Sequence, residues 1–165
     1  MDRNLALEAV RVTEAAALSS ARWMGMGNAT AVEQAAVDAM RRAFDGVSFT
    51  GSIVIGEGDR DTAPTLYIGE VLGNGSASEA DIAVDAVESG VIVAQGRQNA
   101  ISVIAVADKG SLLQVPNVYM EKIAVGPKAA GAINIIAPPE KNLRSIAESM
   151  SCYVEDLRSE ERRVG

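Results

Sequence analysis

Three carboxylates follow apolar runs that are typical of buried strands, and they are the first candidates for chemistry. Glu57 stands in IVIGEGD between Gly56 and Gly58, while Asp85 and Glu88 stand three positions apart in DIAVDAVESG. Acids that gather at the edge of a sheet repel one another unless a cation lies between them. Spacing alone leaves two interpretations open, a cation site and two ordinary loops rich in acid and glycine.

The composition restricts which cation such a site could hold. The chain contains no histidine and a single cysteine, Cys152. Histidine-based general-base catalysis and histidine metal sites are therefore excluded, and a bound cation would be a hard one, Mg²⁺ or Mn²⁺, held by oxygen. Backbone N–H groups of a helix opening after Asp85 would suit a phosphate. A fourth acid, Glu33, has a competing explanation, because Thr30 and Glu33 have the spacing of a capping box.

Charge and hydropathy exclude several classes of protein. The 165 residues include 15 basic and 22 acidic side chains, which gives a formal net charge of −7 at pH 7. This balance argues against a nucleic-acid binder or an anionic-membrane binder. No apolar run approaches the roughly 18 residues of a membrane span, and the start, MDRNLALEAV, does not resemble a secretion signal. One cysteine allows no internal disulfide, so we expect a cytoplasmic protein.

The elements that would position the acids can be predicted from periodicity. A helical stripe covers residues 4–24, and a second helix is expected over residues 30–44. The pattern then changes to strands, and PPEKNLRSIAESM predicts a closing helix. The expected strands lie in SFTGSIVIGEGD, TLYIGEVLG, DIAVD, AISVIAVADKGSLLQVP (two strands around a turn at 108–110) and EKIAVG. This order indicates an α+β fold, with two N-terminal helices packed on a mixed, mainly antiparallel sheet.

The last eight residues, RSEERRVG, differ in character from the rest of the chain. They are rich in charge, lack an apolar period, and resemble the translation of a common DNA-sequencing adapter. We interpret residues 158–165 as a non-native tail. The alternative is a frayed, charged helix end.

Several stretches resemble the N-terminal part of the class II fructose-1,6-bisphosphatases, which belong to the lithium-sensitive, metal-dependent sugar phosphatases. The stretches are RVTEAAAL followed by WMGMG, IVIGEGDRDTAPTLYIGE, DIAVD and VYMEKIAVGP. The second stretch is long and highly specific. The resemblance extends from residue 4 to about residue 157. It implies a layered α/β sandwich of two domains, of which residues 1–157 would form the first, in a homo-oligomer.

The resemblance also implies an activity, hydrolysis of the 1-phosphate of fructose 1,6-bisphosphate in gluconeogenesis. Some members also act on sedoheptulose 1,7-bisphosphate. Mn²⁺ or Mg²⁺ would polarise the phosphate and lower the pKa of the attacking water. The positions that match the family's metal ligands are Glu33, Glu57, Asp85 and Glu88. The residues expected to act in catalysis are Glu57 and Asp85, and those expected to contact substrate are Glu88, Ser89, Gly90 and Tyr119.

Two segments depart from the family pattern. The family has an aspartate in NTAD where ATAVE places Glu33, whose extra methylene moves the carboxylate by roughly 1.5 Å. The family also has Asp-Pro-Ile-Glu-Gly-Thr where this chain has DAVESG, so Gly90 lacks the threonine hydroxyl unless Ser89 replaces it. Two functions stay open, an active bisphosphatase and a catalytically impaired relative that binds phosphate or metal. The long match disfavours a purely structural domain.

Overall fold

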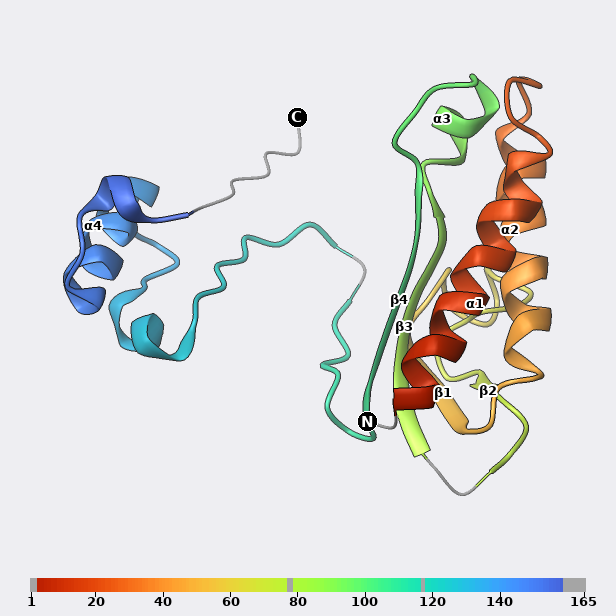
Figure 1. Ribbon diagram of the computed structural model, residues 1–165, viewed down its shortest axis with the longest axis horizontal. Coiled ribbons are helices and arrows are strands. Elements are labelled where there is room, and N and C mark those ends of the chain that lie inside the picture. Colours follow the sequence, from red (N-terminus) through yellow and green to blue (C-terminus); the bar gives the residue numbers. More distant parts are fainter. Residues whose placement is uncertain (1–2, 77–78, 117, 159–165) are drawn as a thin grey trace. The chain divides into compact units, whose positions relative to one another are not determined.

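The computed structural model describes residues 3–76, 79–116 and 118–158, which divide between two compact units at residues 115 and 116. The first unit contains α1 (Arg3–Ala21), α2 (Ala29–Phe44), β1 (Thr50–Ile55), β2 (Val71–Leu72), β3 (Glu79–Glu88), α3 (Gly90–Ala94) and β4 (Ile101–Asp108). The second contains two 3₁₀ helices, η1 (Pro127–Ala132) and η2 (Val154–Asp156), on either side of α4 (Pro139–Met150). Figure 1 shows the elements of both units.

The four strands of the first unit form one mixed sheet in the order β2-β1-β3-β4. β1 and β3 are parallel, whereas the β1–β2 and β3–β4 pairs are antiparallel. Helices α1 and α2 lie together against one face of this sheet (Figure 1). The prediction of an α+β fold with two N-terminal helices on a mixed, mainly antiparallel sheet is therefore confirmed.

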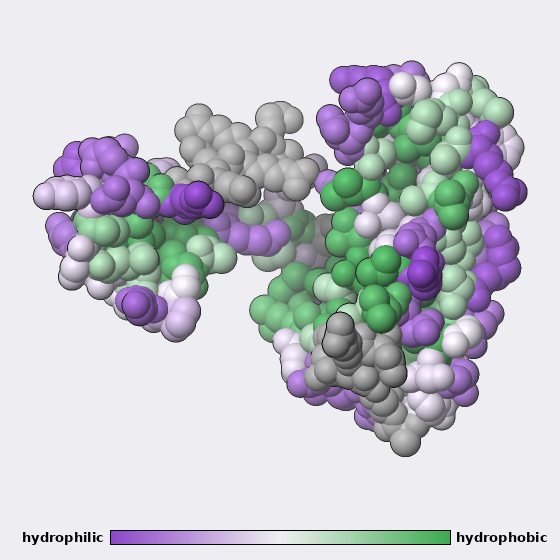
Figure 2. All heavy atoms as spheres, viewed as in Figure 1, coloured by the Kyte–Doolittle hydropathy of each residue, from purple (hydrophilic) through white to green (hydrophobic). Residues whose placement is uncertain are grey.

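The main core lies between the two helices and the sheet. Alternate side chains of β3 point into it, as the twofold repeat of a strand requires. The members contributed by β3, α1 and α2 include Ala80, Ile82, Val84, Ala86, Val12, Ala16, Ala36, Met40 and Phe44. Apolar side chains also reach the surface along α1 and β4, where Leu7, Val10, Ile101 and Val103 are exposed. Figure 2 accordingly shows hydrophobic residues (green) beside hydrophilic ones (purple) on the surface of the first unit.

Several predicted strands are wrong or shorter than expected. Within TLYIGEVLG only Val71–Leu72 is a strand, because residues 65–70 form a tight loop held by Glu70. The second strand expected after the 108–110 turn and the strand expected in EKIAVG do not form in the described residues 109–116 and 121–126. Residues 109–116 and 121–126 are exposed or only half-buried, and an apolar run forms a strand only where a neighbouring strand or layer covers it.

The helix starts also differ from the sequence-based expectation. The N-cap of α2 is Asn28, whose side-chain oxygen accepts a hydrogen bond from the Ala31 N–H at 3.1 Å. The capping box predicted for Thr30 and Glu33 is therefore wrong, and Glu33 is not committed to the helix end. α1 ends at Ala21, three residues before the predicted end, because residues 22–25 turn toward α3. Helix α4 forms within the predicted segment.

The second unit is organised around a buried amide, Asn142. Its side chain accepts a hydrogen bond from the Asn134 N–H and donates to the Asn134 and Ala137 carbonyls. The single domain predicted for residues 1–157 stays a prediction, and residues 159–165 of the predicted tail lie outside the described residues. Among the described helices, none has the length and apolar character needed to cross a membrane.

Candidate functional site

The parallel pairing of β1 and β3 brings two of the predicted acids to the same edge of the sheet. Ile55 pairs with Ala83, and Glu57 and Asp85 each follow two positions later. The Glu57 carboxylate then contacts β3 directly, because its Oε1 accepts a hydrogen bond from the Ala86 N–H at 2.8 Å. This bond engages one oxygen of Glu57 and orients the side chain toward the neighbour of Asp85.

Glu33 reaches the same edge from α2 and lies against Gly90. A Cβ atom placed on Gly90 would come within 2.7 Å of the Glu33 Cγ and 2.8 Å of its Oε1. Any side chain at position 90 would therefore have to displace Glu33. Positions 33 and 90, both described above as departures from the family pattern, therefore lie against each other.

Burial and mutual repulsion perturb the acids of this edge. Partial burial raises the pKa of Glu57 first, the Ala86 hydrogen bond opposes that rise, and the charges of Asp85 and Glu33 add to it. Burial also raises the pKa of Asp85, with the Glu88 charge next, an opposing hydrogen bond from the Val87 N–H, and then Glu33. The four predicted ligands are thus electrostatic neighbours, and a cation would relieve their repulsion.

The chemical type of the four predicted ligands fits a hard cation, but their side chains do not converge on one point. All four groups are carboxylates, the ligands that Mg²⁺ and Mn²⁺ prefer. In the part of the chain that the structure describes, however, no three acidic side chains stand close enough to hold a metal ion as they are. The expected convergence on one cation therefore stays a prediction that requires side-chain movement.

The chain after Asp85 differs from the expected helix start. Strand β3 continues to Glu88 with a register shift between these two acids, and α3 opens only at Gly90. Ser89 is the exposed N-cap, with a left-handed backbone (φ 69°, ψ 70°) that favours glycine. Its hydroxyl caps no N–H group of α3 within the described residues. The helix expected after Asp85 therefore opens later than expected, at Gly90, and its role in binding phosphate stays a prediction.

Tyr119, the remaining predicted substrate contact, belongs to the second unit. Its side chain is 90% exposed, and its neighbours 118–126 have irregular backbone. The substrate-binding role of Tyr119 stays a prediction.

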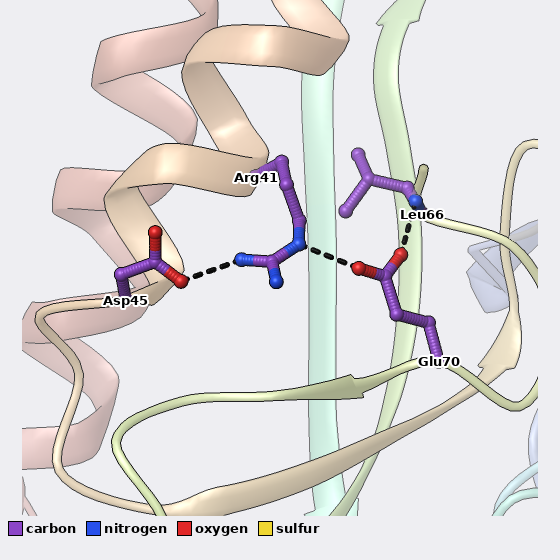
Figure 3. Close-up of polar contacts among 4 residues, drawn as sticks. All are labelled: Arg41, Asp45, Leu66 and Glu70. Carbon is purple, nitrogen blue, oxygen red and sulfur yellow. Dashed lines mark hydrogen bonds and ion pairs between the residues drawn. The ribbon is translucent and has the colours of Figure 1, made fainter. Parts of the chain in front are cut away.

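One buried acid of the first unit was missed by sequence reasoning. Glu70 is buried, and its carboxylate contacts both Arg41 of α2 and the Leu66 N–H (Figure 3). The sequence offered one signal, an acid inside the apolar run TLYIGEVLG. An acid in such a run must either face solvent or have a polar partner. Its partner, Arg41, lies 29 positions earlier, and nothing local in the sequence identifies it.

A helix-covered mixed sheet, with carboxylates gathered beyond two parallel strands, is consistent with the class of metal-dependent phosphatases. Residues 3–159 match the family described as bacterial fructose-1,6-bisphosphatase, glpX-encoded, and the chain belongs to this family. The resemblance inferred from the sequence is confirmed.

Curated relatives agree with this membership. The D-fructose 1,6-bisphosphatase class 2/sedoheptulose 1,7-bisphosphatase of Synechococcus sp. (strain JA-2-3B'a(2-13)) is 44% identical over 169 residues, covering 95% of this chain and 49% of the relative. Fructose-1,6-bisphosphatase 1 class 2 of Escherichia coli (strain K12) is 46% identical over 157 residues, covering 95% of this chain and 47% of the relative. The chain spans about half the length of these relatives.

Proposed function

We propose that this chain supplies the N-terminal part of a class II fructose-1,6-bisphosphatase site. The reaction would be metal-dependent hydrolysis of the 1-phosphate of fructose 1,6-bisphosphate to fructose 6-phosphate and phosphate, a phosphoric monoester hydrolase activity of gluconeogenesis. Family membership supports this reaction. The observation that carries it is geometric: the β1–β3 pairing and the Ala86 hydrogen bond set Glu57 beside Asp85, and Glu33 lies against Gly90 at the same edge. Burial and the neighbouring charges raise the pKa of both Glu57 and Asp85. The Synechococcus relative's name adds sedoheptulose 1,7-bisphosphate as a second substrate.

In this proposal the four carboxylates Glu33, Glu57, Asp85 and Glu88 hold Mn²⁺ or Mg²⁺. When bound, the cation supplies phosphate polarisation and water activation. The chain itself contributes orientation, because the Ala86 N–H fixes one oxygen of Glu57 and leaves the other for the cation. The backbone around Ser89 and Gly90 would face the phosphate, and Tyr119 would bind the sugar. These last contacts rest on the family resemblance alone.

A second function is favoured by the contact between Glu33 and Gly90. The hydroxyl that the resemblance implies at position 90 is missing, and the Glu33 side chain occupies the space that a side chain there would need. A chain of this kind could bind phosphate or metal and hydrolyse the substrate slowly or not at all. Loss of one positioned catalytic group costs about 10²–10⁴ in rate.

A hybrid chain separates the two functions. Residues 1–157 would be joined to the part of the Escherichia coli relative that follows the matched region, and phosphate release would be measured with fructose 1,6-bisphosphate and Mn²⁺ or Mg²⁺. An active bisphosphatase releases phosphate and loses about 10²–10⁴ of that rate in Glu57→Gln. The matched control, Glu8→Gln, removes an exposed carboxylate from α1 and should leave the rate unchanged.

The impaired relative gives a different result in the same hybrid. It releases phosphate only after Glu33→Asp is combined with replacement of residues 85–90 by Asp-Pro-Ile-Glu-Gly-Thr. If the original and restored hybrids are equally fast, the impaired function is wrong. If neither releases phosphate while both are folded and bind Mn²⁺, the bisphosphatase function is wrong for this chain.

We also propose a cytoplasmic location and a homo-oligomer. The single cysteine supports a reducing compartment, and the family resemblance supports self-association. Sedimentation velocity on the hybrid chain tests the second point, and a monomer at micromolar concentration would contradict it.

A further inference from the structure

Glu70 is a buried acid that the proposed reaction does not use. Glu70 is only 9% exposed, and each of its carboxylate oxygens accepts a hydrogen bond. Oε1 accepts from the Arg41 Nε at 2.5 Å, and Oε2 accepts from the Leu66 N–H at 2.5 Å. The Arg41 Nη1 also contacts the Asp45 carboxylate at 2.6 Å (Figure 3). A buried carboxylate is costly to the fold unless such partners satisfy it, so its placement calls for an explanation.

The backbone of Leu66 has an unusual conformation at this point. Leu66 is fully buried and has a φ of +57°, in the left-handed region that bulky residues rarely adopt. Such a conformation persists only where the surroundings hold it, and it gathers at functional sites. Here the Leu66 side chain belongs to the main core, and its N–H is held by Glu70.

The carbonyl of Leu66 connects this conformation to the candidate site. It accepts a hydrogen bond from the Glu57 N–H at 3.0 Å. A Cβ on the preceding Gly56 would lie 2.2 Å from the Leu66 oxygen, so glycine is what lets the two backbone segments approach. Glu57 is therefore held at two points, its N–H by Leu66 and its carboxylate by the Ala86 N–H of β3.

We infer that Glu70, paired with Arg41, is a positioning residue for Glu57 and acts through the left-handed backbone of Leu66. The connection runs from α2 through Glu70 and Leu66 to Glu57 and ends on β3. It deepens the proposed function and rests on it, because Glu57 matters for chemistry only if it holds the cation. Glu70 itself touches neither substrate nor cation in this assignment.

The first test measures positioning without any metal. Amide hydrogen exchange of the 165-residue chain would be followed by NMR in Glu70→Gln, where one amide oxygen replaces two acceptors. Protection should fall at least tenfold at the N–H groups of Glu57 and Ala86, while the N–H of Ile82, inside β3, keeps its protection. A merely structural Glu70 would lower the protection of all three groups together or of none, and either result overturns the inference.

A matched control uses the other acid on the same guanidinium. Asp45→Asn removes a carboxylate that contacts Arg41 and leaves the Glu70–Leu66 contact in place. Its exchange at Glu57 and Ala86 should equal that of the original chain. Where Glu70→Gln does not fold, Arg41→Lys keeps the positive charge without the planar Nε–H. Unchanged protection at Ala86 in folded Arg41→Lys would contradict the inference.

The second test measures Mn²⁺ alone, by titration with electron paramagnetic resonance. Glu70→Gln should weaken Mn²⁺ binding roughly 10- to 100-fold, as groups behind metal ligands commonly do, and Asp45→Asn should not. If Glu57→Gln weakens binding but Glu70→Gln does not, the positioning role is wrong and the proposed function stands. If Glu57→Gln leaves Mn²⁺ binding unchanged, the proposed metal role of Glu57 is wrong, and the exchange data alone decide whether Glu70 positions it.

Discussion

Asp81 and Asp85 stand four residues apart in β3 and project from the same face of the strand. Asp81 is 2% exposed and is surrounded by donors. Its Oδ2 accepts from the N–H groups of Gly110 at 2.8 Å and Leu112 at 3.2 Å, and Lys109 lies 3.3 Å from Oδ1. Burial alone would raise the pKa of Asp81, but the Leu112 N–H, Lys109 and the Gly110 N–H together lower it.

Asp85, by contrast, is surrounded by other acids. Burial and the charges of Glu88 and Glu33 raise its pKa, and one backbone N–H, from Val87, opposes them. One strand therefore carries a carboxylate whose environment stabilises its charge and another whose environment penalises it. The first kind holds a local structure, here the turn after β4, while the second kind is typical of candidate functional sites.

The largest expected difference between the two aspartates is in turnover. In the hybrid chain with Mn²⁺, Asp85→Asn should lower the rate of phosphate release about 10²- to 10⁴-fold, because it removes a proposed ligand and catalytic group. Asp81→Asn should change the rate less than about threefold, because it acts on a distant turn. Steady-state phosphate release under saturating substrate measures both. Equal losses of rate in the two variants would contradict the different roles assigned to Asp81 and Asp85.

Thermal stability should respond in the opposite order. Asp81→Ala leaves the Gly110 and Leu112 N–H groups without their acceptor and should lower Tm by roughly 5–10 °C. Asp85→Ala removes repulsion and should leave Tm at pH 7.5 unchanged or slightly higher. Calorimetry in a metal-free buffer gives both values. A drop of similar size in Asp85→Ala would show that Asp85 is structural as well.

The pH dependence of the two aspartates should have opposite signs. The pKa of Asp85 is raised in the folded state. Its contribution to the stability of the fold is therefore fully present below the unfolded pKa of about 4 and is lost as pH rises through the folded pKa. Asp85→Asn should therefore gain about 2–3 °C in Tm at pH 7.5, and that gain should vanish near pH 4. The increment is small because water screens a half-exposed group.

For Asp81 the folded-state pKa is lowered, so its stabilising contribution is present above the unfolded pKa and lost as pH falls through the folded value. Asp81→Asn should be destabilised at pH 7.5 and approach the original chain at the acid end. Melting curves of Asp81→Asn and Asp85→Asn, recorded from about pH 4 to about pH 7.5, test both predictions. If the higher Tm of Asp85→Asn persisted at pH 4, the charge of Asp85 would not be the cause, and the proposed repulsion from neighbouring acids would be wrong.

The smallest expected effect lies at the end of the same strand. Ser89 adopts a left-handed backbone, and glycine removes that strain while adding freedom to the unfolded chain. Ser89→Gly should raise Tm by about 1 °C, the small difference between these opposing effects. Asn99, another left-handed position, provides the control Asn99→Gly. A decrease in Tm for Ser89→Gly would indicate that its hydroxyl makes a stabilising contact.

Prediction from sequence succeeded where the signal is local. The apolar stripes of α2 and α4 and the buried run of β3 predicted their elements, because periodicity reports directly on which side chains are buried. It failed at residues 65–70, since the loop depends on Glu70 meeting Arg41 across 29 positions. The cap at Asn28 was missed because Thr30 and Glu33 offered an equally plausible local pattern.

The site was predictable in part for the same reason. Acids placed just after strands could be identified, but the parallel register of β1 and β3 that sets Glu57 beside Asp85 is a tertiary property. The contact between Glu33 and Gly90 is likewise invisible in the sequence, because 57 positions separate the two residues and no pattern links them.

That contact makes positions 33 and 90 interdependent. A side chain introduced at position 90 alone would meet the Glu33 Cγ and Oε1, so the Glu33 side chain would have to take another conformation to accept it. A hydroxyl introduced at position 90 is therefore expected to need a matching change at position 33. The effects of the two substitutions should not add when each is made alone.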